Sequence, residues 1–287
     1  MTQDPFIAHR NLLFTVAYEM LGSAADAEDV VQETWLRWDS IDQAKIGSPR
    51  AYLVRMVTRQ SLNRLRSESR RREDYVGPWL PEPLLTTPDV ADDVELAESV
   101  SFAMLTVPET LGPTERVVFV LRDVFDTPYH EIADILSKTP EAVRQIAHRA
   151  RKHVAAKRPR IHVDPDEQRA VVQKFLSAVS TGDVESLIEV LAPEVVAIAD
   201  GGGVVPALRS PVSGAAKLAN LLVHFASTPG FEASVALLNG SYGVRIEVDG
   251  RSIAVMLSVE HGRVTQIHAI ANPRKLGKLN QTVKLQR

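Results

Sequence analysis

Apolar residues in the first part of the chain recur at the spacing of a helix. Residues 6–21, 24–38 and 50–66 repeat apolar positions every three or four residues, which predicts three amphipathic helices. Gly22-Ser23 ends the first helix, and Pro49 suits the first turn of the third. The second helix has an apolar side formed by Val30, Val31, Thr34, Trp35 and Trp38.

Prolines interrupt this pattern after the third helix. Residues 75–88 read YVGPWLPEPLLTTP, and four prolines with one glycine exclude a helix or a central strand, so we place a linker at residues 75–92. Trp79 and Leu80 are large apolar residues in this linker. Because a free linker rarely keeps an aromatic ring in water, we expect both to dock on another part of the protein.

Residues 127–154 have the pattern of a helix-turn-helix, preceded by predicted helices at 94–107 and 114–124. Thr139 is a suitable N-cap, and Pro140 fits the first turn of the second helix. The buried stripe of that helix is formed by Val143, Ile146, Ala147 and Ala150. Its outer face is basic and carries amides, which favours a helix that lies in the major groove of DNA.

The pattern changes from residue 164 onward. Residues 164–191 have helical spacing, and short alternating runs follow at 195–199, 232–237, 241–248, 251–260 and 263–270. Gly240, Asp249-Gly250 and His261-Gly262 separate these runs as turns. Helices followed by hairpin strands predict an α+β domain with an antiparallel sheet.

Charge is distributed unevenly along the 287 residues, whose formal net charge is only −3. Residues 50–72 contain eight arginines and one acid, Glu68, while residues 138–160 contain eight Lys or Arg residues and one acid, Glu141. Such segments indicate binding to nucleic acid, although the whole chain is slightly acidic.

Other function classes are disfavoured by composition. The chain has no cysteine, which excludes disulfides and cysteine metal sites, and we expect neither a metal nor a cofactor. No apolar run is long enough to span a bilayer. The first residues, MTQDPFIAHR, lack the order of a signal peptide, so we expect a cytoplasmic protein.

Several motifs occur in an order that resembles the extracytoplasmic-function (ECF) sigma factors of bacterial RNA polymerase. DAEDVVQETWLRW and SPRAYLVRMVTRQSLNRLRS resemble sigma region 2, and AVRQIAHRARKHV resembles sigma region 4. YVGPWLPEP, ADGGG (199–203) and NPRKL (272–276) resemble the subgroup with a fused C-terminal SnoaL-like domain.

The resemblance implies a multidomain fold. Two all-α sigma domains, at residues 1–74 and 93–158, are expected on either side of the linker. An α+β SnoaL-like cone is expected at 164–287, with residues 281–287 beyond the recognised motifs.

The resemblance also implies a transcription initiation factor that binds core RNA polymerase and directs it to promoters. The implied contacts with the clamp helices of the largest polymerase subunit are Asp26, Glu28, Asp29, Gln32, Glu33, Thr34 and Arg37. The implied −10 element contacts are Arg50, Arg55, Arg59, Asn63, Arg64 and Arg66. The preceding loop, residues 41–48, is expected to capture a flipped base.

Sigma region 4 is expected to read the −35 element and to lie near the flap region of polymerase. The implied DNA contacts are Thr139, Glu141, Arg144, Gln145, His148, Arg149, Arg151 and Lys152. Arginine can bind guanine and glutamine can bind adenine through paired hydrogen bonds. Arg151, Lys152, Lys157 and Arg158 are expected to touch phosphates.

The fused domain is expected to regulate the sigma domains by holding the linker, and its pocket can also hold a small-molecule ligand. The implied interdomain residues are Trp79, Leu80, Asp200, Gly201, Gly202, Gly203, Asn272, Pro273, Lys275 and Leu276.

Two alternatives remain open from the sequence. The first is a SnoaL-like cyclase or isomerase with a DNA-binding regulatory half and Asp200 and His268 as acid and base. However, a turn role for Asp200 and a core role for His268 are preferred, with no catalytic residue. The second is an ordinary helix-turn-helix repressor, which leaves the arginines of residues 50–72 unexplained.

Overall fold

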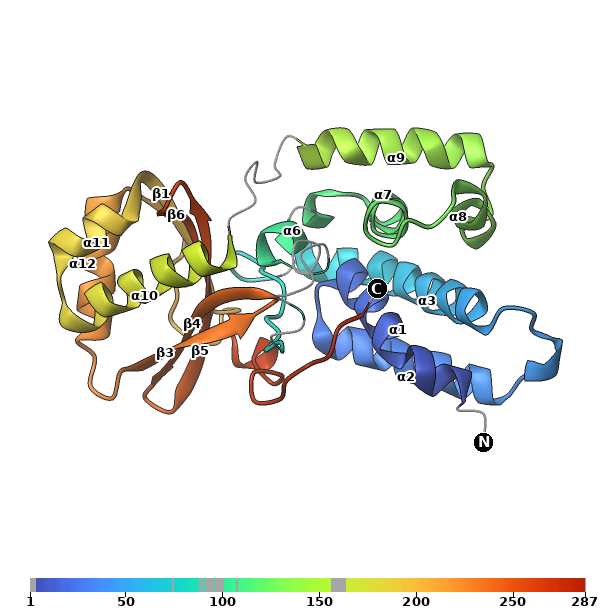
Figure 1. Cartoon of the computed structure of the whole chain (residues 1–287), viewed down its shortest axis with the longest axis horizontal. Helices are drawn as coiled ribbons and strands as arrows, with labels where there is room; N and C mark the ends of the chain where they lie inside the picture. Colours follow the sequence, from blue (N-terminus) through green and yellow to red (C-terminus); the bar gives the residue numbers. More distant parts are fainter. Residues whose placement is uncertain are drawn as a thin grey trace. The chain divides into compact units, whose positions relative to one another are not determined.

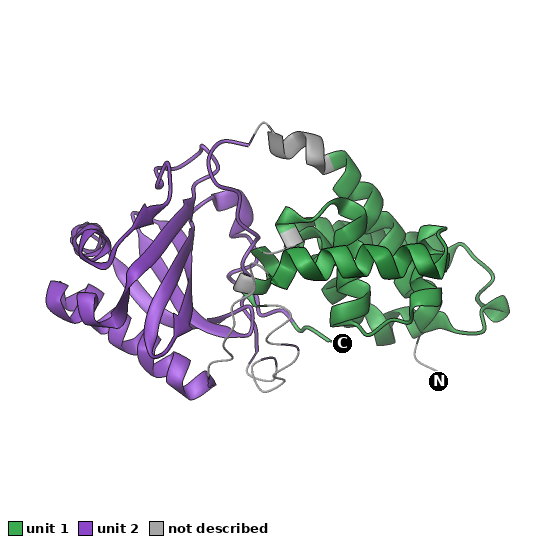
Figure 2. Cartoon of the chain, turned by 90° about the horizontal axis from the view of Figure 1, so that it is seen from above, with its two compact units in different colours: residues 1–73, 98–158, 284–287 green, residues 74–97, 159–283 purple. Residues whose placement is uncertain are grey.

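The structure is a computed structural model that describes residues 4–73, 75–87, 90, 96, 101–106, 108–155 and 164–286, with only the backbone of residues 68–73, 103 and 108. It divides into two compact units (Figure 2). The helical unit contains Met1–Glu73, Glu98–Arg158 and Lys284–Arg287, and the sheet unit contains Asp74–Ala97 and Pro159–Val283. The two predicted sigma regions therefore share one unit, while the predicted linker belongs to the unit of the C-terminal domain.

Three helices form the predicted region 2: α1 (Pro5–Leu21), α2 (Ala24–Asp39) and α3 (Pro49–Glu73) (Figure 1). The Asp4 side chain caps α1 by accepting from the Phe6 amide, and Ser23 caps α2 by accepting from Asp26. Gly22 ends α1 in the left-handed conformation, as its missing side chain permits. A short 3-10 turn, Gln43–Lys45, lies in the loop before α3.

The predicted region 4 contains α6 (Phe102–Thr106), a 3-10 turn (Pro108–Thr110), α7 (Pro113–Phe119), a π-helical turn (Val120–Val124), α8 (Tyr129–Leu136) and α9 (Pro140–Ala155). The Thr139 hydroxyl accepts from the Ala142 amide at 3.2 Å, which confirms its role as N-cap. The predicted stripe of α9 is buried. Half of the predicted helix at 94–107 lies outside the described residues.

The last residues of the chain belong to the helical unit. The Gln286 amide donates to the Thr15 hydroxyl at 3.0 Å, and Leu285 is buried. Residues 284–286, part of the segment 281–287 that the sequence left unassigned, therefore lie against α1.

The sheet unit has six strands in the order β2-β1-β6-β5-β4-β3. Its helices α10 (Pro165–Thr181), α11 (Val184–Val190) and α12 (Ala215–Ala226) cover one face of the sheet (Figure 1). The strands are β1 (Leu191–Asp200), β2 (Val212–Ser213), β3 (Glu232–Leu238), β4 (Ser241–Val248), β5 (Arg251–Glu260) and β6 (Arg263–Ile270). All neighbouring strands are antiparallel except β1 and β6, which are parallel.

Three tight turns fix the register of the hairpins. Asn239-Gly240, Asp249-Gly250 and His261-Gly262 each have positive φ at both positions, the conformation of the hairpin turn that suits the twist of a sheet. The predicted bounds of β4, β5 and β6 are confirmed. The helix-then-hairpin architecture expected for the C-terminal domain is also confirmed.

His268 lies in the second half of β6, where it is 5 % exposed. Burial disfavours the charged imidazolium and lowers the pKa of His268 to about 4. This core position agrees with the structural role preferred from the sequence.

The buried His268 predicts an acid-sensitive sheet unit. Its unfolded-state pKa is near 6.5, so the unfolded chain binds the proton first and stability falls as pH drops from about 6.5 to about 4. The loss should reach about 3 kcal/mol in the free energy of unfolding. Chemical denaturation at pH 7 and pH 4.5 should show a smaller loss for His268→Gln than for the native protein, and equal losses would contradict the assignment.

Candidate functional site

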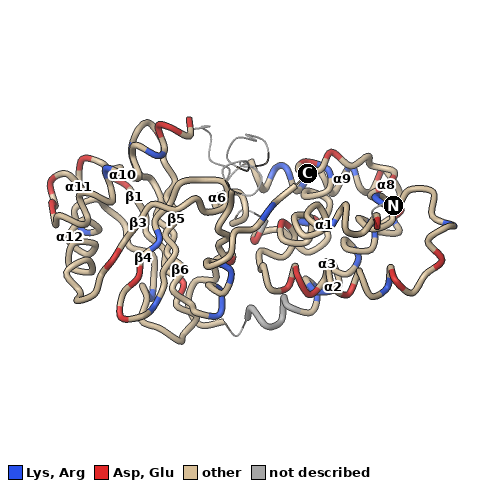
Figure 3. Tube along the Cα trace, turned by 60° about the horizontal axis from the view of Figure 1, so that its bottom comes forward, with Lys and Arg blue, Asp and Glu red and all other residues tan. Residues whose placement is uncertain are grey.

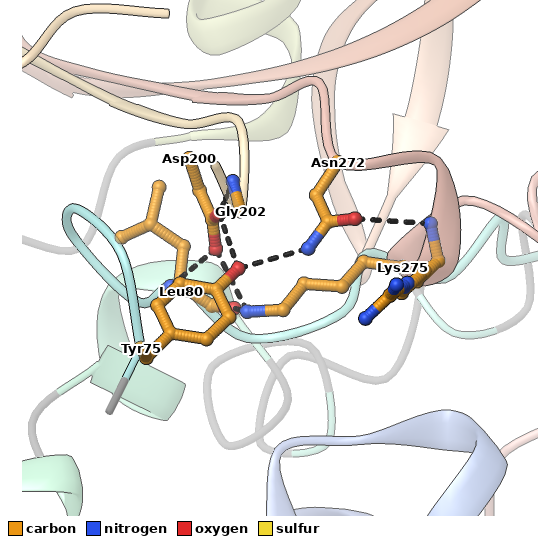
Figure 4. A network of polar contacts seen from close by, with 7 residues as sticks. Tyr75, Leu80, Asp200, Gly202, Asn272 and Lys275 are labelled. Atoms are coloured by element: carbon orange, nitrogen blue, oxygen red, sulfur yellow. Dashed lines mark hydrogen bonds and ion pairs between the residues drawn. The ribbon is translucent and has the colours of Figure 1, made fainter. Parts of the chain in front are cut away.

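The parallel pairing of β1 and β6 brings two distant motifs together. Asp200, the last residue of β1, pairs with Ile270, and its carbonyl oxygen accepts from the amides of Ala271 and Asn272. The glycine loop that follows β1, Gly201–Gly203, therefore lies beside the 3-10 turn Pro273–Lys275 (Figure 4). The Asp200 side chain is fully buried at this junction.

Two groups of the linker donate to the Asp200 carboxylate (Figure 4). The Tyr75 hydroxyl reaches Oδ1 at 2.5 Å, and the Leu80 amide reaches Oδ2 at 2.9 Å. The Gly202 amide also donates to Oδ1 at 3.0 Å, and the Lys275 ammonium lies 2.7 Å from Oδ2. One buried carboxylate thus joins the linker to both motifs.

Lys275 is the cation that balances this carboxylate. Its side chain is 8 % exposed, and Nζ also donates to the Leu80 carbonyl at 2.5 Å. The Trp79 and Tyr75 rings stand 4.0 and 4.8 Å from Nζ, within the range of cation–π attraction. Trp79, which was expected to dock on another part of the protein, therefore packs on the buried ammonium of Lys275. Leu80, the second residue expected to dock, is buried.

Burial keeps the Tyr75 hydroxyl protonated. The pKa of Tyr75 is raised first by burial and then by its hydrogen bond to Asp200. The hydroxyl therefore donates to Asp200 while accepting from the Asn272 amide at 2.9 Å.

The glycines of the loop are required by close packing. A Cβ on Gly202 would stand 2.2 Å from the Asn272 amide nitrogen, and one on Gly203 would stand 2.9 Å from Val76 Cβ of the linker. Both glycines also have positive φ. Side chains at these positions would push the linker and the Asn272 segment away from the loop.

A second set of contacts holds the linker further along. The Leu84 amide donates to Asn239 Oδ1 at 3.0 Å, and the Asn239 amide donates to the Leu84 carbonyl at 2.9 Å. The Thr86 amide donates to the Leu237 carbonyl at 3.0 Å. Residues 75–86 therefore lie along the sheet unit, and the predicted interdomain residues meet there. Of the remaining ones, Gly201 is in the glycine loop, Pro273 starts the 3-10 turn and Leu276 is buried after it.

The acids at the start of α2 have partners within region 2. Asp26 and Asp29 both pair with Arg64 of α3, the latter at 3.2 Å, and Glu28 pairs with Arg10 at 2.7 Å. Three predicted polymerase contacts and one predicted −10 contact therefore hold the bundle together. Thr34 is buried, whereas the exposed predicted contacts of α2 are Gln32, Glu33 and Arg37.

The sequence assigned Trp35 to the buried side of α2, and this was wrong. Trp35 is 41 % exposed, and its neighbour Leu36 is 56 % exposed. Val30, Val31, Thr34 and Trp38 are all buried. Helical spacing alone could not have identified Trp35 as exposed, because it lies four positions after the buried Val31.

The predicted −10 contacts on α3 occupy different environments. Arg50, Asn63 and Arg66 are exposed. Arg59 donates to the carbonyls of Ile135 and Asp134 in α8, at 3.0 and 3.2 Å. Arg55 lies 4.0 Å from the Asp134 carboxylate.

The outer face of α9 carries a stripe of exposed polar residues, formed by Glu141, Arg144, Gln145, His148 and Lys152. Arg149 and Arg151 are instead turned toward Glu115 and Asp123, at 3.5 and 2.7 Å. The hydrogen bond to Asp123 raises the pKa of Arg151. Lys157 and Arg158 lie outside the described residues. Figure 3 marks the Lys and Arg positions along α3 and α9.

Among the described residues, no group of three or more His, Asp or Glu side chains could hold a metal ion. None of the described helices combines the length and apolar character needed to cross a membrane.

The carboxylate network predicts slow hydrogen exchange at the Leu80 amide. Lys275→Met leaves the buried Asp200 charge without its cation, and breaking a buried pair in this way costs about 3–5 kcal/mol. Exchange at Leu80 should therefore quicken by roughly 100-fold or more, as measured by mass spectrometry of the linker peptide.

The matched control is Lys217→Met, which removes an exposed lysine of α12. It should leave exchange at Leu80 unchanged. Equal exchange in the Lys275→Met protein and the native protein would show that the linker is held by other contacts.

Comparison with known proteins agrees with the motifs. The family model of sigma-70 region 2 matches residues 6–71, and that of sigma-70 region 4 matches residues 102–154. The ECF RNA polymerase sigma factor SigJ of Mycobacterium tuberculosis is 40% identical, over 96% of this chain and 93% of that protein. The probable ECF RNA polymerase sigma factor SigI of Mycobacterium tuberculosis is 34% identical, over 95% of this chain and 93% of that protein.

A solved structure extends this likeness to the whole fold. The crystal structure of Mycobacterium tuberculosis SigJ matches with a TM-score of 0.78 and 36% identity, and the match covers 97% of this chain and 99% of that chain. Both sigma regions and the C-terminal domain are therefore shared. The chain belongs to the ECF RNA polymerase sigma factors, non-enzymatic initiation factors that bind core RNA polymerase and promoter DNA.

Proposed function

We propose that this sigma factor divides its tasks among three surfaces and a docked linker. The C-terminal half of α2 binds polymerase, α3 reads the −10 element, and α9 reads the −35 element. The sheet unit controls the tether between regions 2 and 4. The observation that carries the regulatory part is the buried pair of Asp200 and Lys275, which both contact Leu80 of the linker.

The exposed half of α2 suits a protein partner. Trp35 and Leu36 offer apolar area, and Arg37 and Glu33 flank them with charge. Aromatic residues and arginines are enriched where proteins bind one another. We assign this surface to the clamp helices of the largest polymerase subunit, and we assign the flap region to region 4.

The exposed polar residues of α3 suit a phosphate backbone. Arg50, Asn63 and Arg66 are exposed, and arginines that neutralise phosphates give salt-dependent affinity. Arg64 contributes indirectly, because its ion pairs with α2 fix the position of the helix.

The stripe on α9 separates base reading from phosphate binding. Arg144, Gln145 and His148 are near the start of the helix, where recognition helices contact base edges. Lys152 lies nearer the C-terminal end of α9, where we assign its exposed ammonium group to a phosphate of the DNA backbone. Arg149 and Arg151 would have to leave their carboxylate partners to reach DNA.

The docked linker limits how far apart regions 2 and 4 can move. Residues 74–100 could span roughly 90 Å if fully extended. The −10 and −35 elements are about 25 base pairs apart by name, or about 85 Å along the duplex. Since residues 75–86, 12 of these 27 residues, are bound to the sheet unit, their share of that length is not available until the linker is released.

The proposed role in initiation also predicts where the protein works. A factor that acts on chromosomal promoters works in the cytoplasm, where we place this protein. A small-molecule ligand for the C-terminal domain stays a prediction of the sequence.

Base-reading residues should differ from phosphate-binding residues in a promoter library. Arg144→Ala or Gln145→Ala should each cost about 1–3 kcal/mol at one base pair of the −35 element. Lys152→Ala should weaken binding to all promoter sequences alike, and it should reduce the salt dependence of DNA binding by about one phosphate contact. Transcription by core polymerase loaded with each variant measures this, and identical profiles for the three would contradict the assignment.

Release of the linker should change promoter output. Trp79→Ala and Lys275→Met should alter transcription from a matched promoter with core polymerase several-fold, since burial of a large apolar side chain is worth about 1.5–3 kcal/mol. Lys217→Met should behave as the native protein. If both linker variants also match the native protein, the domain does not regulate initiation through the linker.

A further inference from the structure

The C-terminal end of α8 in region 4 is bound by an arginine of region 2. Arg59 of α3 donates through Nε to the Ile135 carbonyl at 3.0 Å and through an Nη atom to the Asp134 carbonyl at 3.2 Å. Both carbonyls lie in the last turn of α8, a helix with no basic residue of its own in that turn. Arg59 therefore supplies the cation that the end of this helix favours.

The C-terminal end of α1 in region 2 is bound in the same way by an arginine of region 4. Arg116 of α7 donates to the Met20 carbonyl at 2.8 Å, and its guanidinium pairs with Glu109. α1 also has no basic residue in its last turn. The Arg116 side chain is 3 % exposed, and burial lowers its pKa to about 9, so it stays charged at neutral pH.

The two contacts are reciprocal, since each region inserts an arginine at the end of a helix in the other. We propose that Arg59 and Arg116 form an arginine latch that holds regions 2 and 4 in a closed, inactive arrangement. This inference rests on the proposed roles of α3 and α9 in promoter reading, and it adds an inhibitory contact within the sigma domains themselves.

The closed arrangement is too short to read a promoter. With Arg59 bound to α8, regions 2 and 4 are packed side by side in one helical unit. The longest helix of that unit, α3, would measure about 37 Å, whereas the two promoter elements lie about 85 Å apart. Regions 2 and 4 must therefore separate before both elements are bound.

The latch also occupies a residue of the −10 surface. While Arg59 donates to the α8 carbonyls, its guanidinium is withheld from phosphates. Arg55 also pairs with α8, because its guanidinium lies 4.0 Å from the Asp134 carboxylate. Opening therefore both separates the regions and exposes part of the DNA-binding surface.

The test measures opening and activity in the full chain. Because the protein has no cysteine, Asp39→Cys in region 2 and His130→Cys in region 4 give two exposed positions for spin labels. Double electron–electron resonance spectroscopy then measures the distance between the two spin labels, and so between the two regions. Arg116→Met removes the buried half of the latch without touching a proposed DNA or polymerase contact.

A second variant guards against misfolding. Asp134 is exposed, so Asp134→Lys should fold normally while placing a cation beside Arg55 and Arg59. Glu131→Lys makes the same charge change at an exposed position of the same helix and is the matched control. Circular dichroism confirms that each variant is folded.

We expect longer inter-label distances for Arg116→Met and Asp134→Lys and an unchanged distribution for Glu131→Lys. Both opened variants should bind core polymerase more tightly, by about tenfold for Arg116→Met, because the binding-competent state is no longer rare. Unchanged distances in the folded Asp134→Lys protein, or opening without tighter binding, would overturn the latch. If no protein, native or variant, supports promoter-specific initiation, the proposed function fails instead.

Discussion

The fixed position of the linker depends on one buried carboxylate. Asp200 has no exposure to solvent, and a charge in that position is tolerated only with paired partners. Those partners come from the linker, the glycine loop and the turn after β6. Removing the linker would take Tyr75 and Leu80 from the carboxylate and the aromatic rings from Lys275. The linker is therefore part of the domain's core rather than a segment resting on its surface.

Polar residues of the predicted DNA-binding helices lie in two different environments. Arg64 and Arg151 are bound to carboxylates within their own regions, where they support helix packing. Arg50, Gln145 and His148 are exposed on helices whose apolar stripes are already buried. Net charge and arginine counts could not separate Arg64 and Arg151 from Arg50, because each of the three arginines contributes equally to them. The surface that we propose for DNA binding is thus smaller than the basic segment that contains it.

Much of the fold could be predicted from the sequence, because its signals are local. The turns Asp249-Gly250 and His261-Gly262 fix hairpin geometry within two residues, and Thr139 caps α9 from the adjacent position. Contacts between distant residues leave no such signal. Nothing in the chain near Arg59 indicates that it meets the end of α8, and nothing near Arg116 indicates Met20. The motifs around Asp200 and Asn272 were recognisable, but their meeting depends on the parallel pairing of β1 and β6.

The linker and the arginine contacts oppose opening by different physical means. Docking of Tyr75 and Leu80 shortens the tether, whereas Arg59 and Arg116 stabilise the packed regions directly. A ligand shifts such an equilibrium only by binding the open state more strongly. A phosphate carries a full charge, while the end of a helix carries only about half of one, so DNA competes well for Arg59 but cannot reach the buried Arg116. Under the proposed latch, polymerase is then the partner that supplies the remaining free energy, and promoter DNA selects the open state only after polymerase has made it accessible.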